Sequence, residues 1–180
     1  LPSFSENFGI AAAEALMEGI DETAVDFDGD GHRNLRTSIA DAMASSAALL
    51  IKHGWKPNQP WLQEVRVPRD LPWDQADIAI KHPRSQWAKW GVKGKFKADN
   101  FPAALLLPMG KDGPAFFAYD NFTTAYLLWN ESLVYSTTAA YLATRIAGAP
   151  KVSAGNGEVT PLSYKQIIDL QKILAAKGYD

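Results

Sequence analysis

Cysteine is absent from the 180 residues of this chain, which excludes disulfides, thiolate metal sites and a cysteine nucleophile. No apolar run approaches the length of a membrane-spanning helix. The formal net charge is only −2, so nothing in the charge favours nucleic acid or an anionic membrane surface as a partner. Apolar residues make up 47% and charged residues 21%, as in a chain that folds around a hydrophobic core. The chain opens at Leu1 with no signal peptide, and we expect a processed or trimmed product.

Residues 26–35 match the first half of an EF-hand calcium loop, and the candidate loop as a whole covers residues 26–41. Three aspartates alternate with other residues, a glycine follows the third, and the next carbonyl and an Asn stand at ligand positions seven and nine. Position twelve is Thr37, where a bidentate Glu is expected, and the next carboxylate lies in the first turn of the following helix. We therefore predict calcium with an altered closing ligand; the plainer interpretation is an Asp/Gly-rich surface turn. The candidate ligands are Asp26, Asp28, Asp30, His32 through its carbonyl, Asn34 and Asp41.

Asp41 has a second interpretation that is equally good. Residues 38–53 predict a helix that Ser38 caps, and an acid at its third position suits a capping box and the helix dipole. The apolar face of this helix is predicted to contain Ile39, Met43, Ala47 and Leu50.

Hydrophobic periodicity and turn residues predict the remaining elements. Residues 10–20 favour a short helix, and residues 85–91 a capped helix that ends at a glycine. Residues 103–119 read as two apolar strands around a Gly/Asp/Pro turn, and residues 63–67 supply a third strand. A helix is expected from about residue 130 to Gly148, followed by a linker over 149–161 and a last helix over 164–177.

Several of these segments resemble, in the same order, the lytic murein transglycosylases of the B type (glycoside hydrolase family 103-like). The segments that carry the resemblance are Val25–Leu35, Asp41–Ser45, His53–Trp55, Ser85–Gly91, Gly110–Phe116, Asn121–Phe122 and the pattern Asn130-x-Ser132-x-x-Tyr135. The resemblance implies an α+β fold, with a mainly helical, lysozyme-like core portion, an EF-hand-like calcium loop and a small antiparallel β subdomain over about 62–122. It also implies that residues 1–148 are the C-terminal part of a catalytic domain, and that 162–180 begin a truncated peptidoglycan-binding domain.

The function that the resemblance implies is cleavage of the MurNAc–GlcNAc β-1,4 bond of peptidoglycan to give 1,6-anhydromuropeptides. Trp129, Asn130, Ser132 and Tyr135 would then line the glycan groove, although Asn130 is also a plain helix-cap residue. Peptidoglycan strands are the expected partner, envelope proteins are further candidates, and the expected location is the periplasm or cell envelope of a Gram-negative bacterium.

The family's single catalytic Glu has no clear counterpart in this chain. Glu6 echoes the family motif Glu-Ser-x-Phe-Gly, but its spacing differs by one residue and it lies too close to the calcium loop. We therefore expect the catalytic Glu to lie outside this chain. A non-catalytic peptidoglycan-binding or scaffold relative and an unrelated secreted calcium-stabilised module remain as alternatives.

Overall fold

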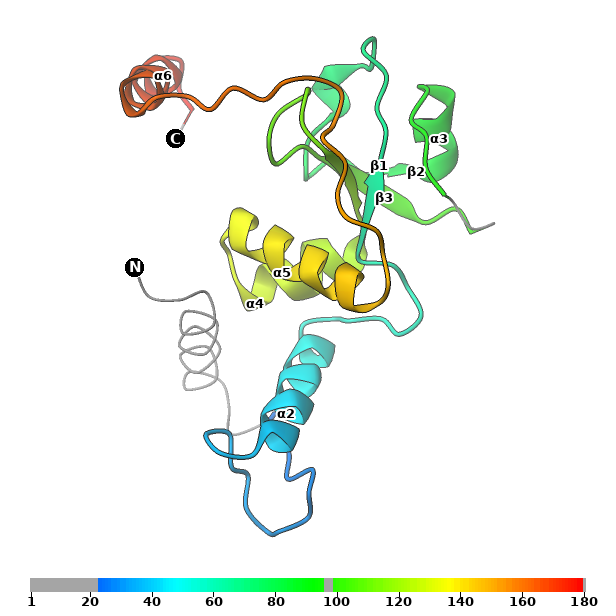
Figure 1. Cartoon of the computed structure of the whole chain (residues 1–180), viewed down its shortest axis with the longest axis vertical. Helices are drawn as coiled ribbons and strands as arrows, with labels where there is room; N and C mark the ends of the chain where they lie inside the picture. The colour runs from blue at the N-terminus through cyan, green and yellow to red at the C-terminus, as the bar shows by residue number, and fades with distance from the viewer. Residues whose placement is uncertain (1–22, 96–98, 180) are drawn as a thin grey trace.

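The computed structural model describes residues 23–95 and 99–179, so the expected helix over 10–20 and Glu6 lie outside the described residues. Helices and a small antiparallel sheet make up the fold, as expected (Figure 1). The helical segments are α2 (Ile39–Lys52), η1 (Trp73–Gln75), α3 (Arg84–Lys89), η2 (Asn121–Tyr126), α4 (Leu127–Trp129), α5 (Leu133–Ile146) and α6 (Tyr164–Ala176). The strands are β1 (Leu62–Val65), β2 (His82–Pro83), β3 (Pro102–Leu106) and β4 (Ala115–Ala118). No helix in the described ranges has the length and apolar character needed to cross a membrane.

The four strands form one antiparallel sheet in the order β1-β4-β3-β2. The predicted hairpin is confirmed as β3 and β4, and the predicted third strand pairs with β4, with Gln63 opposite Phe117. β2 was not predicted, because two residues that include a proline carry no strand pattern. All four residues of β4 are buried, so helical segments must cover both faces of the sheet.

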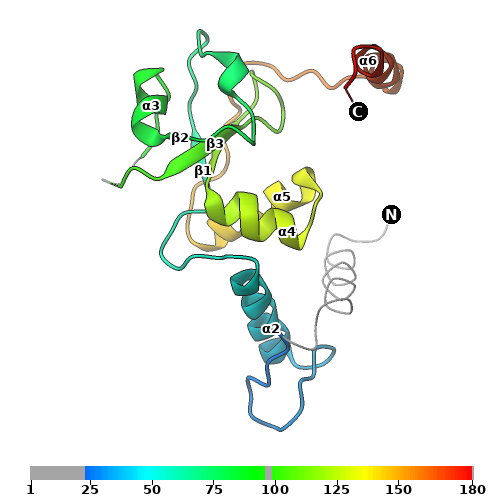
Figure 2. The same ribbon diagram turned by 180° about the vertical axis from the view of Figure 1, so that it is seen from behind.

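Two hydrophobic clusters cover the two faces of the sheet. On one face, Trp87 of α3 is fully buried against Phe117, and its indole N–H donates to the Ala103 carbonyl at 2.8 Å. On the other face, Phe116 packs with Phe122 of η2 and Ala140 of α5. α3 and α5 therefore lie on opposite sides of the sheet (Figures 1 and 2).

α2 joins the rest of the molecule through the loop that follows it, and a buried asparagine fastens that loop. The Asn121 side chain accepts from Lys56 N at 2.7 Å and donates to the carbonyls of Lys56 and Gln59. Asn121 is completely buried at the start of η2, so it ties this loop to the α5 side of the sheet.

The buried face of α2 is not the one that its hydrophobic pattern predicts. Ile39 and Met43 are exposed by 77% and 69%, whereas Asp41, Ser45 and Leu49 are buried. The polar members of this buried face bind the loop before the helix, because Ser45 Oγ accepts from Val25 N at 2.8 Å and Asp41 accepts from two further amides of that loop.

A strap, residues 152–157, lies along the sheet within the segment that composition predicts as a linker. The backbone N–H groups of Asn156 and Gly157 both donate to the Asp112 carbonyl, and the Asn156 amide donates to the Val67 carbonyl. Gly155 lies so close to Gly113 that a Cβ at position 155 would overlap its backbone. α6 follows as a separate helix (Figure 1) without buried residues. Its predicted Ser163–Gln166 capping box is present.

Candidate functional site

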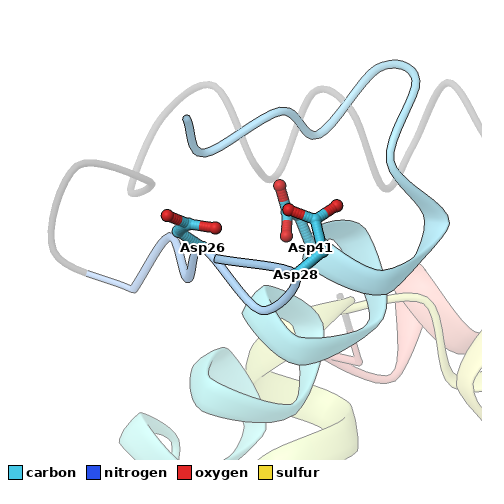
Figure 3. Close-up of side chains that lie close together, drawn as sticks. All are labelled: Asp26, Asp28 and Asp41. Carbon is cyan, nitrogen blue, oxygen red and sulfur yellow. The ribbon is translucent and has the colours of Figure 1, made fainter. Parts of the chain in front are cut away.

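The acidic loop and the first turn of α2 bring three carboxylates together, two from the loop and one from the helix. Ligand oxygens of Asp26, Asp28 and Asp41 all lie within 4.8 Å of one another (Figure 3). Two oxygens that bind one Ca²⁺ at 2.3–2.6 Å can be at most about 5 Å apart, so this spacing fits a shared cation. Asp30 and His32 are not part of this group.

Hydrogen bonds to backbone amides shape the loop. Asp26 accepts from Gly29 N and Gly31 N at 2.8 and 2.9 Å, and Asp30 accepts from His32 N at 2.8 Å. Gly29 and Gly31 have φ of 76° and 86°, which favour glycine. Asn34 bonds through its side chain to Thr37, the residue that stands where an EF-hand has its bidentate Glu. The Asn34 side-chain amide is therefore hydrogen-bonded within the loop.

Asp41 takes part in the cap of α2 and also lies in the acidic group before the helix. Its backbone N–H donates to Ser38 Oγ, as a capping interaction requires, and its carboxylate reaches back to the loop. There it accepts from Phe27 N at 2.8 Å and Asn34 N at 2.9 Å, and these two amide bonds hold the pKa of the Asp41 carboxyl below its ordinary value. A fully buried, ionised carboxylate beside Asp28 is a site of concentrated negative charge.

The four predicted glycan-groove residues lie together at the N-terminus of α5. Trp129 and Tyr135 form an aromatic pair with ring centroids 5.7 Å apart, and both side chains are partly exposed. The N-cap of α5 is Ser132, whose Oγ accepts from Tyr135 N, so the interpretation of Asn130 as the N-cap is wrong. Instead, Asn130 accepts from Ser132 N at 2.9 Å and orients the cap.

The turn that presents Trp129 was not predicted. η2 is a short π-helix, and α4 follows it directly as an α-helical turn that ends at Trp129. Such π turns are frequent near functional sites, but their wider spacing has no distinctive hydrophobic pattern. Tyr126, at the end of η2, supports Trp129 edge-on with ring centroids 6.4 Å apart.

The carboxyl groups of Asp41 and Asp120 have clearly shifted pKa values, and both are shifted downward. The pKa of Asp41 is lowered by its amide bonds, and that of Asp120 by Lys81, which donates to it at 2.8 Å, with Lys56 as a weaker partner. A general acid that works near neutral pH needs a raised carboxyl pKa. Neither group therefore has the properties of a general acid, and Glu6 lies outside the described residues.

Comparison with protein families identifies one match, to the transglycosylase SLT domain over residues 16–144. Comparison with curated protein sequences gives no match. Among solved structures, SltB3 from Pseudomonas aeruginosa in complex with NAG-anhNAM-pentapeptide superposes with a TM-score of 0.75 and 38% identity over 88% of this chain. The same protein in complex with NAG-NAM-pentapeptide gives a TM-score of 0.74 and 39% identity over the same share.

A more distant similarity links the chain to Escherichia coli Slt35. Its structure in complex with calcium superposes with a TM-score of 0.56 and 26% identity over 74% of this chain. This chain spans 44% of the SltB3 chain and 41% of the Slt35 chain, less than half of each.

Proposed function

This chain belongs to the transglycosylase SLT family, and on that premise we propose that it forms part of a peptidoglycan lytic transglycosylase. The reaction is cleavage of the MurNAc–GlcNAc β-1,4 bond with formation of a 1,6-anhydro product, and the setting is the periplasm of a Gram-negative bacterium. We assign the chain to the B type (glycoside hydrolase family 103-like), with residues 162–180 as the start of a peptidoglycan-binding domain. The observation that carries the proposal is the 38% identity to SltB3, whose complex contains a NAG-anhNAM-pentapeptide.

The N-terminus of α5 supports the glycan-binding part of this proposal. Trp129 and Tyr135 are both half-buried, with the Tyr135 hydroxyl buried, and the exposed part of the pair can contact a sugar ring. Asn130 and Ser132 supply amide and hydroxyl groups that can hydrogen-bond sugar hydroxyls and acetamido groups. One stacking surface with adjacent polar groups suits a glycan strand.

The catalytic acid is proposed to lie outside this chain, so the 180 residues alone should release few soluble products. General acid catalysis contributes about 10²–10⁴-fold, and a rate lower by that factor is expected. The test is to incubate the chain with peptidoglycan and to quantify 1,6-anhydromuropeptides by mass spectrometry, with a full-length relative as the positive control. Release at the relative's rate would overturn this assignment, and Glu6→Gln would then show whether Glu6 is the acid.

Calcium is the proposed ion of the acidic loop. Asp26, Asp28 and Asp41 would supply carboxylate oxygens, and Asp30, Asn34 and the His32 carbonyl are the further candidates. Bound there, a divalent cation would offset the repulsion among the carboxylates and fix the loop against α2.

Calcium should therefore raise the melting temperature of the chain, because an ion that binds only the folded state stabilises it. Thermal unfolding is followed in 1 mM Ca²⁺ and in excess chelator; an Asp28→Asn variant should lose most of the difference. The matched control is Asp70→Asn, which makes the same charge change at an exposed position outside the loop. A melting temperature that is the same with and without calcium would contradict the assignment. So would a loss of the calcium-dependent difference in Asp70→Asn as large as in Asp28→Asn.

A further inference from the structure

A cavity of about 550 Å³ opens along the outer edge of β1, at the far end of α5 from the glycan residues. One wall is β1 itself, and Phe116 and Tyr141 contribute apolar side chains to the lining. Residues 93–95 and 149–153 border the remainder. We call this cavity the edge slot.

The edge of β1 that faces the slot directs backbone hydrogen-bonding groups outward, away from β4. Tyr119 N donates to Trp61 O, and backbone groups of successive residues in an antiparallel strand point to opposite edges. Gln63 and Val65 therefore direct their backbone groups to β4. Leu62 and Glu64 direct theirs to the outer edge. Arg66 confirms this alternation, because its N–H and C=O pair with Lys93 on that outer edge at 2.8 Å each.

Beyond the Arg66–Lys93 pair the ladder stops within the described residues. Lys95 bonds to β1 only through its carbonyl, which accepts from the Gln63 side chain at 2.7 Å. In the described part of the chain, Leu62 and Glu64 form no backbone bond on their outer side. An extended segment beside β1 would meet two N–H and two C=O groups in strand register.

The charge around the slot is strongly positive, although the whole chain has a net charge of −2. Arg66, Lys93, Lys95 and Lys151 line it, are exposed, and form no ion pair within the described chain. Among the described residues that line the slot, Glu64 is the one acid, and its carboxylate already accepts from Ser153 N at 2.9 Å. The slot therefore complements an anionic occupant.

From this edge and this charge we infer that the slot binds an extended acidic segment of a partner protein as an additional antiparallel strand beside β1. Backbone bonds to Leu62 and Glu64 would set the register, and acidic side chains would contact the lysines. Apolar side chains on alternate positions would lie on Phe116 and Tyr141, since successive residues of a strand point to opposite faces. A protein segment is the occupant favoured here, because it presents consecutive backbone N–H and C=O groups in strand register together with acidic side chains.

The first test is of charge. A fluorescein-labelled, end-blocked hexapeptide of alternating glutamate and valine is titrated with the 180-residue chain, and binding is followed by fluorescence anisotropy. Lys93→Glu combined with Lys95→Glu should weaken binding at least about tenfold, because like charges then face the peptide. Lys89→Glu with Lys111→Glu is the matched control: it makes the same charge change at exposed positions outside the slot and should leave binding within about twofold. Melting temperatures verify that both variants fold.

The second test is of the backbone. Two further versions of the hexapeptide are made, one N-methylated at its odd-numbered amides and the other at its even-numbered amides. In each version the methyl groups block hydrogen bonding along one edge of the strand. One version should bind like the parent peptide and the other should lose binding, because only one edge of an added strand faces β1.

Four results would overturn the inference: no binding of the acidic hexapeptide, equal binding of both methylated versions, equal weakening by the two lysine pairs, or full competition by a peptidoglycan pentapeptide. The first would show that the lysines only protect the edge from pairing. The last would assign the slot to peptidoglycan.

Discussion

Single side chains connect segments of this chain that are distant in sequence. Asp41 joins α2 to the acidic loop, Asn121 joins the loop after α2 to η2, and Asp120 draws Lys81 and Lys56 together. Each of these polar groups is matched by specific donors or acceptors, so the arrangement depends on residue identity more than on hydrophobicity.

Lys81→Met should destabilise the fold in a pH-dependent way. Lys81 lowers the pKa of Asp120, so the pair contributes stability above the unfolded carboxyl pKa near 3.9 and loses it as the pH falls through the lower folded pKa. Both side chains are about a third exposed, so the free energy of unfolding at pH 7 should fall by only about 0.2–1 kcal/mol. Urea unfolding at pH 7 and pH 3 measures this loss in the free energy of unfolding, with Lys111→Met as the control. A deficit as large at pH 3 as at pH 7 would contradict the ion-pair explanation.

Sequence reasoning was reliable for residues with local signals and weak for those that act across the fold. The Ser38 cap on Asp41 and the Ser163–Gln166 box follow from spacing alone, and both are present. The bonds from Asp41 to Phe27 N and Asn34 N depend on how the loop returns to the helix, so no periodicity could predict them.

At the scale of elements, the strap is the clearest departure from what composition suggests. A segment rich in Gly, Ser, Pro and Ala reads as a linker, yet three of its backbone or side-chain donors bind Asp112 and Val67. Glycine at 155 is required because its backbone lies against Gly113 and its φ is 86°. From the strap the chain continues over residues 158–163 to α6 (Figure 2).

Gly155→Ala should therefore release the strap. The new Cβ would overlap Gly113. Trypsin should then cleave the bond after Lys151 several-fold faster than in the wild-type chain. Gly110→Ala is the matched control, because Gly110 also has a positive φ, of 76°, but no atom lies within 4 Å of its Cβ position. Equal cleavage rates for the two variants would show that the Gly155–Gly113 contact does not hold the strap.

Elements with strong patterns were predicted correctly, and elements built by tertiary contacts were not. The hairpin of β3 and β4, its partner β1 and helices α2, α3, α5 and α6 are all in place. β2 and the π turn of η2 were missed because each is short and is formed by its neighbours. The exposed Ile39 and Met43 show that a helical pattern predicts an apolar face but not what lies against it.

At the scale of the whole molecule, the fold contains three separate features. The acidic loop precedes α2, the aromatic pair lies at the N-terminus of α5, and the edge slot lies near the C-terminus of α5. Sequence reasoning named Asp26, Asp28 and Asp41 of the first feature and the residues of the second, but not the slot, because its walls come from segments that are distant in sequence.

Binding of NAG-NAM-pentapeptide to the chain is the measurement that tests the proposed function most directly. Isothermal titration should detect binding that Trp129→Ala weakens about threefold to tenfold, as expected for one lost aromatic contact. Trp129→Phe should retain most of the affinity, and Leu128→Ala, at a neighbouring position that is 61% exposed, should retain all of it. No binding to the wild-type chain, or equal affinity of the wild type and a correctly folded Trp129→Ala variant, would contradict a glycan site at the N-terminus of α5.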